Sequence, residues 1–251
     1  MNTPSNWIEW RTYLQENEIT IIQSLLPHSK IKILEIGGGD GFKSMKLHSM
    51  GHDISCVDEE PWDYTYYPVE KIINNHIPHI SKTFDVVISA NVIPVVLDKK
   101  QFFNELERIL KNDGIQIHIV PSPWWSIFTN FWHYIFIPKF LIRSLLPKTE
   151  KSLNTKINPA LKQIDTKKIL KIKKLFMHPL GENPSFFHEI FYFTKNSWIK
   201  LFKYYNFDIL KIKNEKIFFT GYGIFKKKYI KGRNFLGLIF PTQYYFKLKK
   251  S

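Results

Sequence analysis

A glycine-rich turn between a short apolar run and a segment that can form a helix constrains the fold of this chain most strongly. Residues 33–36 read Ile-Leu-Glu-Ile, which is typical of a strand buried on both faces of a parallel sheet. Four glycines lie among the next five residues, and the helical pattern of residues 42–48 follows. Because glycine leaves the main chain uncovered, this order predicts backbone N–H groups that approach a ligand.

The spacing of the glycines separates two kinds of nucleotide site. The dinucleotide fingerprint has the spacing G-x-G-x-x-G. Starting from Gly37 and Gly39, its third glycine would fall on Phe42, so the chain does not carry that fingerprint. An acidic residue, Glu35, is instead followed by alternate glycines, of which Gly41 is the last. This order resembles motif I of the class I S-adenosylmethionine (SAM)-dependent methyltransferases; a glycine-rich turn without a ligand is the alternative.

A carboxylate follows the second predicted strand. Residues 54–57 are apolar or small and end at Asp58, about 20 residues beyond the glycine turn, where such units carry an acidic residue. One ionised carboxylate can accept hydrogen bonds from both hydroxyls of a ribose. The sequence therefore predicts that Asp58 binds the ribose of the cofactor, with an ordinary surface carboxylate as the alternative.

The fourth predicted strand also resembles the methyltransferase family. Residues 84–93 follow its pattern F-D-x-V-x-S-x-x-V-L. Ligands of open α/β sheets bind beyond the carboxyl ends of the strands, so we expect Ser89, Ala90 and Asn91 to face the cofactor. Many relatives continue with Glu-His; Pro94 stands here instead, and no role of that histidine is carried over.

Other segments complete the expected α/β pattern. Helices are predicted over residues 5–26 and 99–110, with a short third strand over 69–73 and a fifth over 115–120. Residues 108–115 resemble the family segment R-x-L-K-P-G-G. The acidic residue that often receives the adenine amino group has no counterpart, and Asn74 or Asn75 is the substitute acceptor.

The chain changes character after the fifth strand, and residues 122–180 are predicted to form an insertion. Its first part is an aromatic helix that Pro138 is expected to end. Residues 139–174 then carry eleven Lys or Arg and only two acidic residues. Two compatible interpretations follow: a lid whose aromatic residues pack on the core, and contact of residues 124–176 with an anionic membrane surface.

The C-terminal part also resembles small-molecule methyltransferases. Residues 198–207 follow the pattern W-x-x-L-F-x-x-x-G-F, in which a helix ends and a strand begins. Asn206 stands in place of the glycine and is expected to adopt the left-handed conformation of a helix cap. We expect a closing hairpin over residues 209–225 around Asn214, and an additional edge strand over 244–250.

These resemblances together imply a single domain, residues 1–251, of the class I methyltransferase fold, of the small-molecule or glycan type (methyltransferase type 11-like). The expected architecture is a doubly wound, mostly parallel α/β sheet of seven strands, whose last strand is antiparallel, with a helical insertion after strand 5. The implied cofactor is SAM, and no metal is expected. The residues expected to bind SAM are Glu35, Gly37, Gly38, Gly39, Gly41, Asp58, Asn75, Ser89, Ala90 and Asn91.

Catalysis would proceed by in-line displacement, in which alignment of the nucleophile and exclusion of water do most of the work. A nitrogen nucleophile needs little further help, whereas a hydroxyl needs a base. The candidate bases are His188, Glu189 and His133, because all three lie in segments expected to cap the cofactor. His188 and Glu189 stand at the start of a strand-like run, residues 189–194, whose start is expected to face the pocket. For the histidines, a structural or surface role is the alternative.

The net charge of +14 suits an anionic partner, although a lysine-rich composition also arises from AT-rich codons. The single cysteine, Cys56, suits a reducing compartment. The N-terminus lacks the pattern of a signal peptide, and no apolar run reaches the length of a membrane span. We therefore expect a cytoplasmic protein, with peripheral contact at the inner membrane face as an addition.

Three functions compete at this stage. The first is SAM-dependent methyl transfer to oxygen or nitrogen of a small-molecule, glycan or lipid-linked acceptor. The second is an RNA methyltransferase, which the positive charge favours but the lack of an appended RNA-binding module and of an Asn-Pro-Pro-Tyr motif disfavours. The third is a non-catalytic binding protein that has kept the fold.

Overall fold

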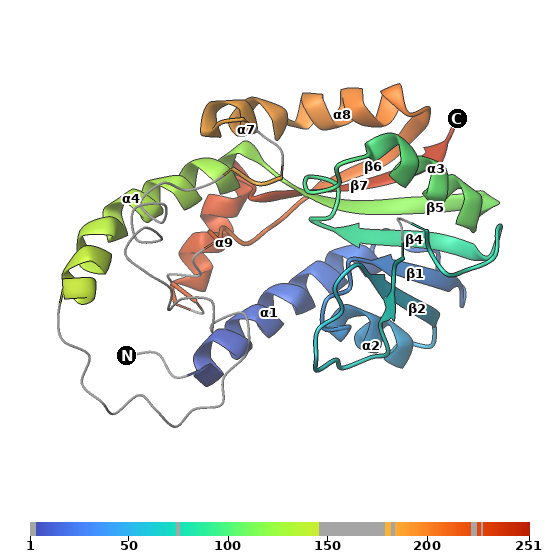
Figure 1. The fold of residues 1–251 in the computed structure, drawn as a ribbon, viewed down its shortest axis with the longest axis horizontal. Coiled ribbons are helices and arrows are strands. Elements are labelled where there is room, and N and C mark those ends of the chain that lie inside the picture. The colour runs from blue at the N-terminus through green and yellow to red at the C-terminus, as the bar shows by residue number, and fades with distance from the viewer. Residues whose placement is uncertain (1–3, 74–75, 146–178, 182–183, 222–224, 227) are drawn as a thin grey trace.

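Seven strands form one mixed sheet in the computed structural model (Figure 1). The model describes residues 4–73, 76–145, 179–181, 184–221, 225–226 and 228–251. The strands are β1 (Lys32–Ile36), β2 (Asp53–Asp58), β3 (Glu70–Lys71), β4 (Phe84–Ala90), β5 (Leu110–Pro121), β6 (Phe207–Asn214) and β7 (Gln243–Lys250). Their order across the sheet is β3-β2-β1-β4-β5-β7-β6, and β7 is antiparallel to both of its neighbours. The expected class I methyltransferase fold is confirmed.

The place of the last strand differs from the prediction. We expected a hairpin over residues 209–225 and an edge strand over 244–250. In the structure, β6 pairs with β7 instead, and β7 lies between β5 and β6. Its burial explains this position, because Tyr245 packs into the core on one face of the sheet and Phe246 into the core on the other. β6, in which Phe207 is the only buried residue, forms this edge of the sheet.

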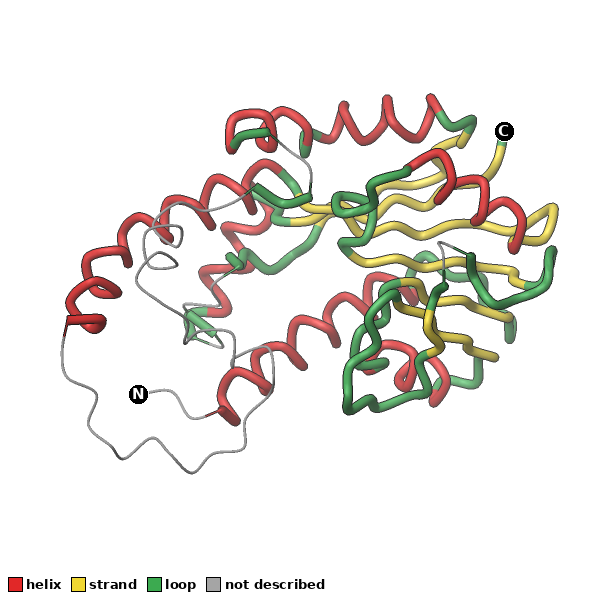
Figure 2. The backbone as a smooth tube through the Cα atoms, viewed as in Figure 1, coloured by secondary structure: helices red, strands yellow, loops and turns green. Residues whose placement is uncertain are grey.

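Helices cover both faces of the sheet (Figure 2). They are α1 (Pro4–Gln23), α2 (Phe42–Ser49), α3 (Lys99–Ile109), α4 (Pro123–Leu145), α7 (Phe186–Tyr192), α8 (Lys195–Tyr204) and α9 (Ile230–Ile239). Apolar residues of α1 and α2 share one core with Ile33 of β1, whereas α3 and α8 share the other with Leu34. Adjacent residues of β1 therefore supply opposite cores, as the period of two in a strand requires.

Two local predictions in the second half of the chain are wrong. α4 does not end at Pro138 but continues to Leu145. Residues 189–194 do not form the expected strand-like run, because Phe186–Tyr192 form helix α7, with Ser185 as its N-cap. The helix before β6 is confirmed as α8, and Asn206 adopts the expected left-handed conformation with φ of 60°.

The chain leaves the sheet at the end of β5, and α4 extends away from it (Figure 1). Residues 146–178 of the expected insertion 122–180 lie outside the described part of the chain. Among the described helices, none combines the length and apolar character needed to cross a bilayer.

Candidate cofactor site and active site

The glycine turn lies at the carboxyl edge of the sheet, the edge at which β1, β2, β4 and β5 end. Gly37, Gly39 and Gly41 have φ values of 71°, 57° and 71°, in the left-handed region that favours glycine. The N–H groups of Gly37 and Gly38 both donate to the carbonyl of Val57, at 2.9 and 3.3 Å, so the turn is anchored to β2.

Neighbouring atoms enclose most of this turn. A Cβ atom on Gly37 would lie 2.3 Å from Val92 Cγ2, and one on Gly38 would lie 2.0 Å from Cys56 Sγ. On Gly39 the nearest atom would be Trp62 Nε1, at 3.6 Å, which is ordinary contact. The turn is therefore bare main chain, packed from below and open at Gly39, which is the form that a nucleoside cofactor requires.

Asp58 is oriented by two backbone N–H groups. Its Oδ2 accepts a hydrogen bond from Gly39 N at 2.8 Å, and its Oδ1 accepts one from Glu60 N at 2.9 Å. The residue is half-buried. A carboxylate has about four lone-pair positions, so these two bonds leave acceptor capacity for ribose hydroxyls. The residues present therefore fit the nucleoside part of SAM.

The Glu35 side chain lies below the turn and does not point to its open side. It is 1% exposed and accepts a 2.6 Å hydrogen bond from Ser44 Oγ. Lys43 Nζ lies 3.6 Å from Glu35 Oε1 and 3.5 Å from Glu18 Oε2 of α1. Burial raises the pKa of Glu35, against the opposing effects of Lys43 and Ser44. This side chain joins α1, α2 and β1 through its contacts with Lys43 and Ser44, and in this position it supports the turn.

Lys43 is buried in the same cluster. Burial by itself would lower the pKa of its ammonium group, but the carboxylates of Glu18, Glu35 and Asp40 outweigh that effect and raise it. The charge of Lys43 therefore compensates the negative charge below the turn.

Three residues that the sequence analysis did not single out lie in or beside the turn. Asp40 is buried and forms an ion pair with Arg11 of α1 at 2.5 Å. The Arg11 guanidinium lies 4.4 Å from the ring centroid of Trp62, the side chain that faces Gly39. Asp40 stands inside the glycine motif and was identifiable from its position. The roles of Arg11 and Trp62 depend on contacts that only the fold creates.

The residues after β4 divide into two groups. Ser89 was expected to face the cofactor, but its hydroxyl is fully buried and lies 2.7 Å from His118 Nδ1. Nε2 of His118 lies 2.7 Å from Gln116 Oε1, and burial lowers the pKa of this histidine to about 3. The Ser89 hydroxyl thus belongs to a neutral core network, because alternate residues of β4 point to opposite faces. Ala90 and Asn91 remain half-buried at the carboxyl edge.

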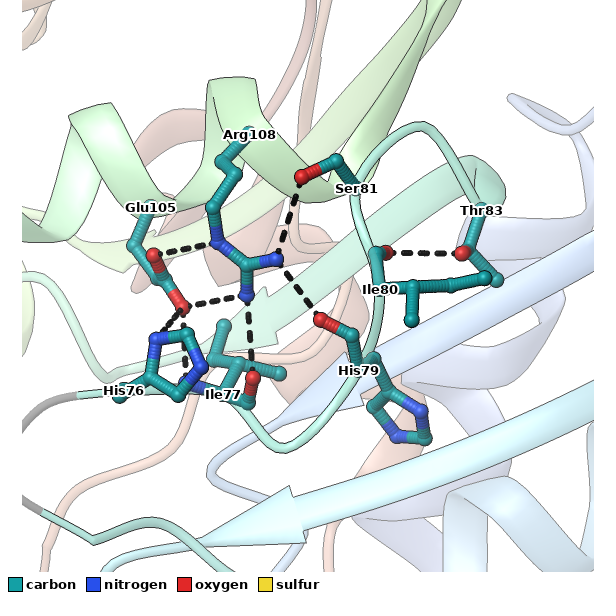
Figure 3. Close-up of polar contacts among 8 residues, drawn as sticks. All are labelled: His76, Ile77, His79, Ile80, Ser81, Thr83, Glu105 and Arg108. Carbon is teal, nitrogen blue, oxygen red and sulfur yellow. Dashed lines mark hydrogen bonds and ion pairs between the residues drawn. The ribbon is translucent and has the colours of Figure 1, made fainter.

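The segment after β3 is held against α3 by Arg108 (Figure 3). Arg108 forms two hydrogen bonds with Glu105, of 2.8 and 2.6 Å, and donates to the carbonyls of Ile77 and His79 at 3.0 and 2.7 Å. Glu105 Oε1 also accepts from Ile77 N at 2.8 Å. This network fixes residues 77–79, next to the expected adenine contact Asn75, which lies outside the described residues.

Glu189 is the candidate base that the fold brings toward the carboxyl edge. It is 3% exposed, and its Oε2 accepts a 3.0 Å hydrogen bond from Leu180 N. The next residue, Gly181, packs so closely on the segment after β4 that a Cβ atom there would lie 2.0 Å from the Pro94 carbonyl oxygen. Burial raises the pKa of Glu189, although Leu180 N–H and the Ser126 hydroxyl of α4 oppose the rise.

The two histidines are placed differently. His188 is exposed on α7. His133 is the eleventh residue of α4, so it lies about 15 Å along the helix axis from Pro123, in the part of α4 that leads away from the sheet. The structure does not bring His188, Glu189 and His133 together. Of the three, only Glu189 is buried, beside Ser126 of α4 and bonded to Leu180, whose neighbour Gly181 packs on the segment after β4.

Two surface hollows of the described residues lie away from the glycine turn and Asp58. One of about 630 Å³ is lined by residues that include Thr20, His28 and Gly51, before the starts of β1 and β2. Since ligands of such sheets bind at the carboxyl edge, this hollow is not the cofactor site. Within the described ranges, no group of three or more His, Cys, Asp or Glu side chains could hold a metal ion.

Comparison with known proteins agrees with this geometry. The family described as "Methyltransferase domain" matches residues 34–117, which run from β1 into β5 and include the glycine turn and Asp58. Residues 34–117 are thus similar to a methyltransferase domain. SAM is the cosubstrate that this family implies.

Two curated relatives each match about half of this chain. The first is 2-methyl-6-phytyl-1,4-hydroquinone methyltransferase 1, chloroplastic, of Oryza sativa subsp. japonica, 25% identical over 137 residues, which are 50% of this chain and 39% of that protein. The second is the ubiquinone biosynthesis O-methyltransferase of Bartonella tribocorum, 24% identical over 136 residues, which are 50% of this chain and 53% of that protein. The chain thus spans about half or less of the length of these relatives.

Solved structures of methyltransferases share the fold over most of their length. An S-adenosylmethionine dependent methyltransferase from Mesorhizobium loti has a TM-score of 0.52 at 12% identity, covering 93% of this chain and 98% of that one. Geranyl diphosphate C-methyltransferase from Streptomyces coelicolor A3(2) has a TM-score of 0.53 at 9% identity, covering 96% and 82%. At these identities the likeness concerns the architecture of the methyltransferase domain alone.

Proposed function

We propose that this chain transfers the methyl group of SAM to a small, lipophilic or lipid-linked acceptor. The observation that carries the proposal is the open glycine turn bonded to Asp58, in a domain whose family uses SAM. In this proposal the main chain of residues 37–41 lies against the nucleoside, Asp58 binds the ribose hydroxyls, and Ala90 and Asn91 border the cofactor from the end of β4.

Glu189 is the proposed general base for a hydroxyl acceptor. SAM, when bound, supplies a methyl group already activated by its sulfonium. The Glu189 carboxylate would accept the proton of the acceptor hydroxyl as its oxygen takes that methyl group, and the sulfonium would supply a neutral thioether as the leaving group. Burial, which raises the pKa of Glu189, also makes its carboxylate a stronger base.

The acceptor class rests on the relatives and on the surroundings of the site. Both curated relatives are named for quinone-type chemistry, one for a phytylated hydroquinone and the other for ubiquinone biosynthesis. α4, which begins at the carboxyl edge, carries Trp124, Trp125 and Phe128 in its first turns. Such side chains suit an apolar acceptor better than a nucleic acid, so the RNA alternative is less favoured despite the positive charge.

Calorimetric titration of SAM tests the cofactor part of the proposal. Asp58→Ala should weaken binding at least about tenfold, because two hydrogen bonds to a charged group are lost. Asp63→Ala is the matched control, since Asp63 is an exposed carboxylate of the same loop. Unchanged SAM affinity of Asp58→Ala would show that Asp58 is not part of the binding site. Absence of SAM binding by the unaltered protein would show that SAM is not its cosubstrate.

Transfer of tritiated methyl from SAM into cell fractions tests the acceptor class. For a lipophilic hydroxyl acceptor, we expect the tritium label in the organic extract of the cells. The Glu189→Gln variant should transfer much less label into this extract. Label in structured RNA would establish the alternative function, and label in the water-soluble small-molecule fraction would exclude a lipid-linked acceptor.

A further inference from the structure

Helix α9 presents apolar side chains to the outside of the molecule. Phe235, Leu238 and Ile239 are 64%, 71% and 53% exposed. At 100° per residue these three positions lie on one side of the helix, together with Lys231. Figure 1 shows α9 between α4 and α1, beyond the carboxyl end of the sheet. The described residues therefore leave the largest apolar side chains of α9 uncovered.

The inward side of α9 is formed instead by Arg233 and Gly237, both buried. Arg233 Nε donates a 2.8 Å hydrogen bond to the carbonyl of Phe218, and its guanidinium lies 4.4 Å from the ring centroid of Trp10. A Cβ atom on Gly237 would lie 2.2 Å from the carbonyl oxygen of Lys216. Rotation of α9 to bury its apolar side would break these contacts, so the outward orientation is set by the fold.

The surroundings of this surface are strongly basic. Residues 216–240 contain six Lys or Arg and no acidic residue. Lys228 and Lys231, just before and inside the helix, are exposed. Two copies of the chain that met through α9 would bring these positive charges together without compensation, so the charge favours an anionic occupant.

A second exposed apolar surface adjoins α9. Phe240, which ends α9, packs against Trp124 and Phe128 of α4 with ring centroids 4.7 and 5.9 Å apart. Further along α4, Phe131 and Ile135 are 54% and 46% exposed. An apolar helical face rimmed by lysines is the arrangement of helices that lie in the plane of a lipid interface.

We propose that α9 docks this domain on the surface of a bilayer that contains anionic lipid. Phe235, Leu238 and Ile239 enter the boundary between head groups and acyl chains, and Lys228 and Lys231 lie at the level of the lipid phosphates. The inference deepens the proposed function, because a lipophilic acceptor would then be taken from the membrane. Docking itself requires neither SAM nor catalysis.

Flotation with vesicles of phosphatidylcholine and 30% phosphatidylglycerol tests the proposal at low salt. The unaltered protein should float with these vesicles and much less with pure phosphatidylcholine. The double variant Phe235→Ser/Leu238→Ser should lose at least about tenfold in vesicle affinity, since two buried apolar anchors are removed. Ile80→Ser/Leu97→Ser is the matched control, because those side chains are 80% and 70% exposed outside α9, and it should bind like the unaltered protein.

A second variant, in which exposed charges are changed, tests vesicle binding without altering buried residues. Lys228→Glu/Lys231→Glu leaves the apolar side chains in place and should weaken binding to anionic vesicles at least about tenfold. Failure of the unaltered protein to bind would overturn the proposal, and so would vesicle binding by both α9 variants as tight as that of the unaltered protein. A concentration-dependent dimer that Phe235→Ser/Leu238→Ser abolishes would overturn it in favour of a second copy. SAM titration of the same samples distinguishes the two proposals, because vesicle binding without SAM binding would reject only the proposed function.

Discussion

The amide N–H of Gly39 donates a 2.8 Å hydrogen bond to Oδ2 of Asp58 and so joins the open position of the glycine turn to the end of β2. Two elements that are separated by helix α2 in the chain thereby share one polar contact at the carboxyl edge. The position of the carboxylate and the shape of the turn consequently depend on each other, which gives Asp58 a structural role besides its proposed contact with ribose.

The first prediction concerns this link. Asp58→Ala leaves the N–H groups of Gly39 and Glu60 without their acceptor, so the free energy of unfolding should fall by about 1–3 kcal/mol. Asp58→Asn keeps one acceptor oxygen, so its free energy of unfolding should fall by less than that of Asp58→Ala. Urea denaturation measures both variants. SAM should raise the melting temperature of the unaltered protein and not that of Asp58→Ala; an equal rise in both would contradict the proposed ribose contact.

The second prediction concerns the floor of the turn. Gly38→Ala would place a methyl group 2.0 Å from Cys56 Sγ, so it should destabilise the fold by about 1–3 kcal/mol through overpacking. Removal of the sulfur in Gly38→Ala/Cys56→Ala should restore most of the loss, because the remaining neighbours of the new methyl are at 3.6 and 3.7 Å.

Gly37→Ala supplies the control for that rescue in a double-mutant cycle. Its new methyl group would meet Val92 instead of Cys56, and Gly37 has a φ of 71°, which strains any other residue. Cys56→Ala should therefore not rescue it. If Cys56→Ala rescued both glycine variants equally, or neither, the contact between Gly38 and Cys56 would not be the cause.

The third prediction concerns the network of Figure 3. Arg108→Met removes the donors to Glu105, Ile77 and His79, and at pH 7 it should lower the free energy of unfolding by about 1–3 kcal/mol. Lys111→Met is the comparison, because it removes a more exposed ion pair with Asp85. It should lower the free energy of unfolding by less than about 1 kcal/mol.

The pH dependence of Arg108→Met follows from Glu105. Its hydrogen bond with Arg108 is the largest cause that lowers the pKa of Glu105. A lowered pKa contributes stability above the pKa of the unfolded chain, about 4.3, and that stability is lost as the pH falls through the lower folded value. The difference between Arg108→Met and the unaltered protein should therefore shrink below about pH 4. A constant difference from pH 7 to pH 3 would rule out this coupling.

The fourth prediction concerns Glu189. Burial raises the pKa of this carboxyl group, so the folded protein favours its protonated form more than the unfolded chain does. The favourable contribution is complete below the unfolded pKa of about 4.3 and is lost as the pH rises through the higher folded value. Glu189→Gln resembles the protonated form. Its stability relative to the unaltered protein should therefore increase from pH 4 to pH 8, as measured by urea denaturation.

Glu189→Gln should lower the rate of methyl transfer even where it raises the stability of the fold. The rate with a hydroxyl acceptor should fall by about 10²–10⁴-fold, while the affinity for SAM stays the same. His188→Gln, the matched change at the adjacent exposed residue, should leave both unchanged. Full activity of Glu189→Gln would show that the acceptor needs no base, as for a nitrogen nucleophile.

Local patterns were sufficient for the parallel half of the fold and for the cofactor motif. The apolar run at residues 33–36, the left-handed glycines after it and the acidic end of β2 are properties of short segments, and the structure retains them all. The spacing of Glu35, Gly37 and Gly39, together with the later segments up to residue 115, was enough to predict the resemblance to the methyltransferase family. For the same reason, Asn206 could be assigned a left-handed conformation from its place between a helix and a strand.

Tertiary structure alone decided which side chains face the site and where the last strands pair. The sequence could not reveal that the Ser89 hydroxyl turns to His118, that Glu35 is held below the turn by Lys43, or that β7 enters between β5 and β6. The backbone pattern of a short segment follows from its own residues, whereas the direction of a polar side chain and the partner of a strand depend on contacts with residues distant in the chain. Those contacts exist only once the two cores have formed on either side of the sheet.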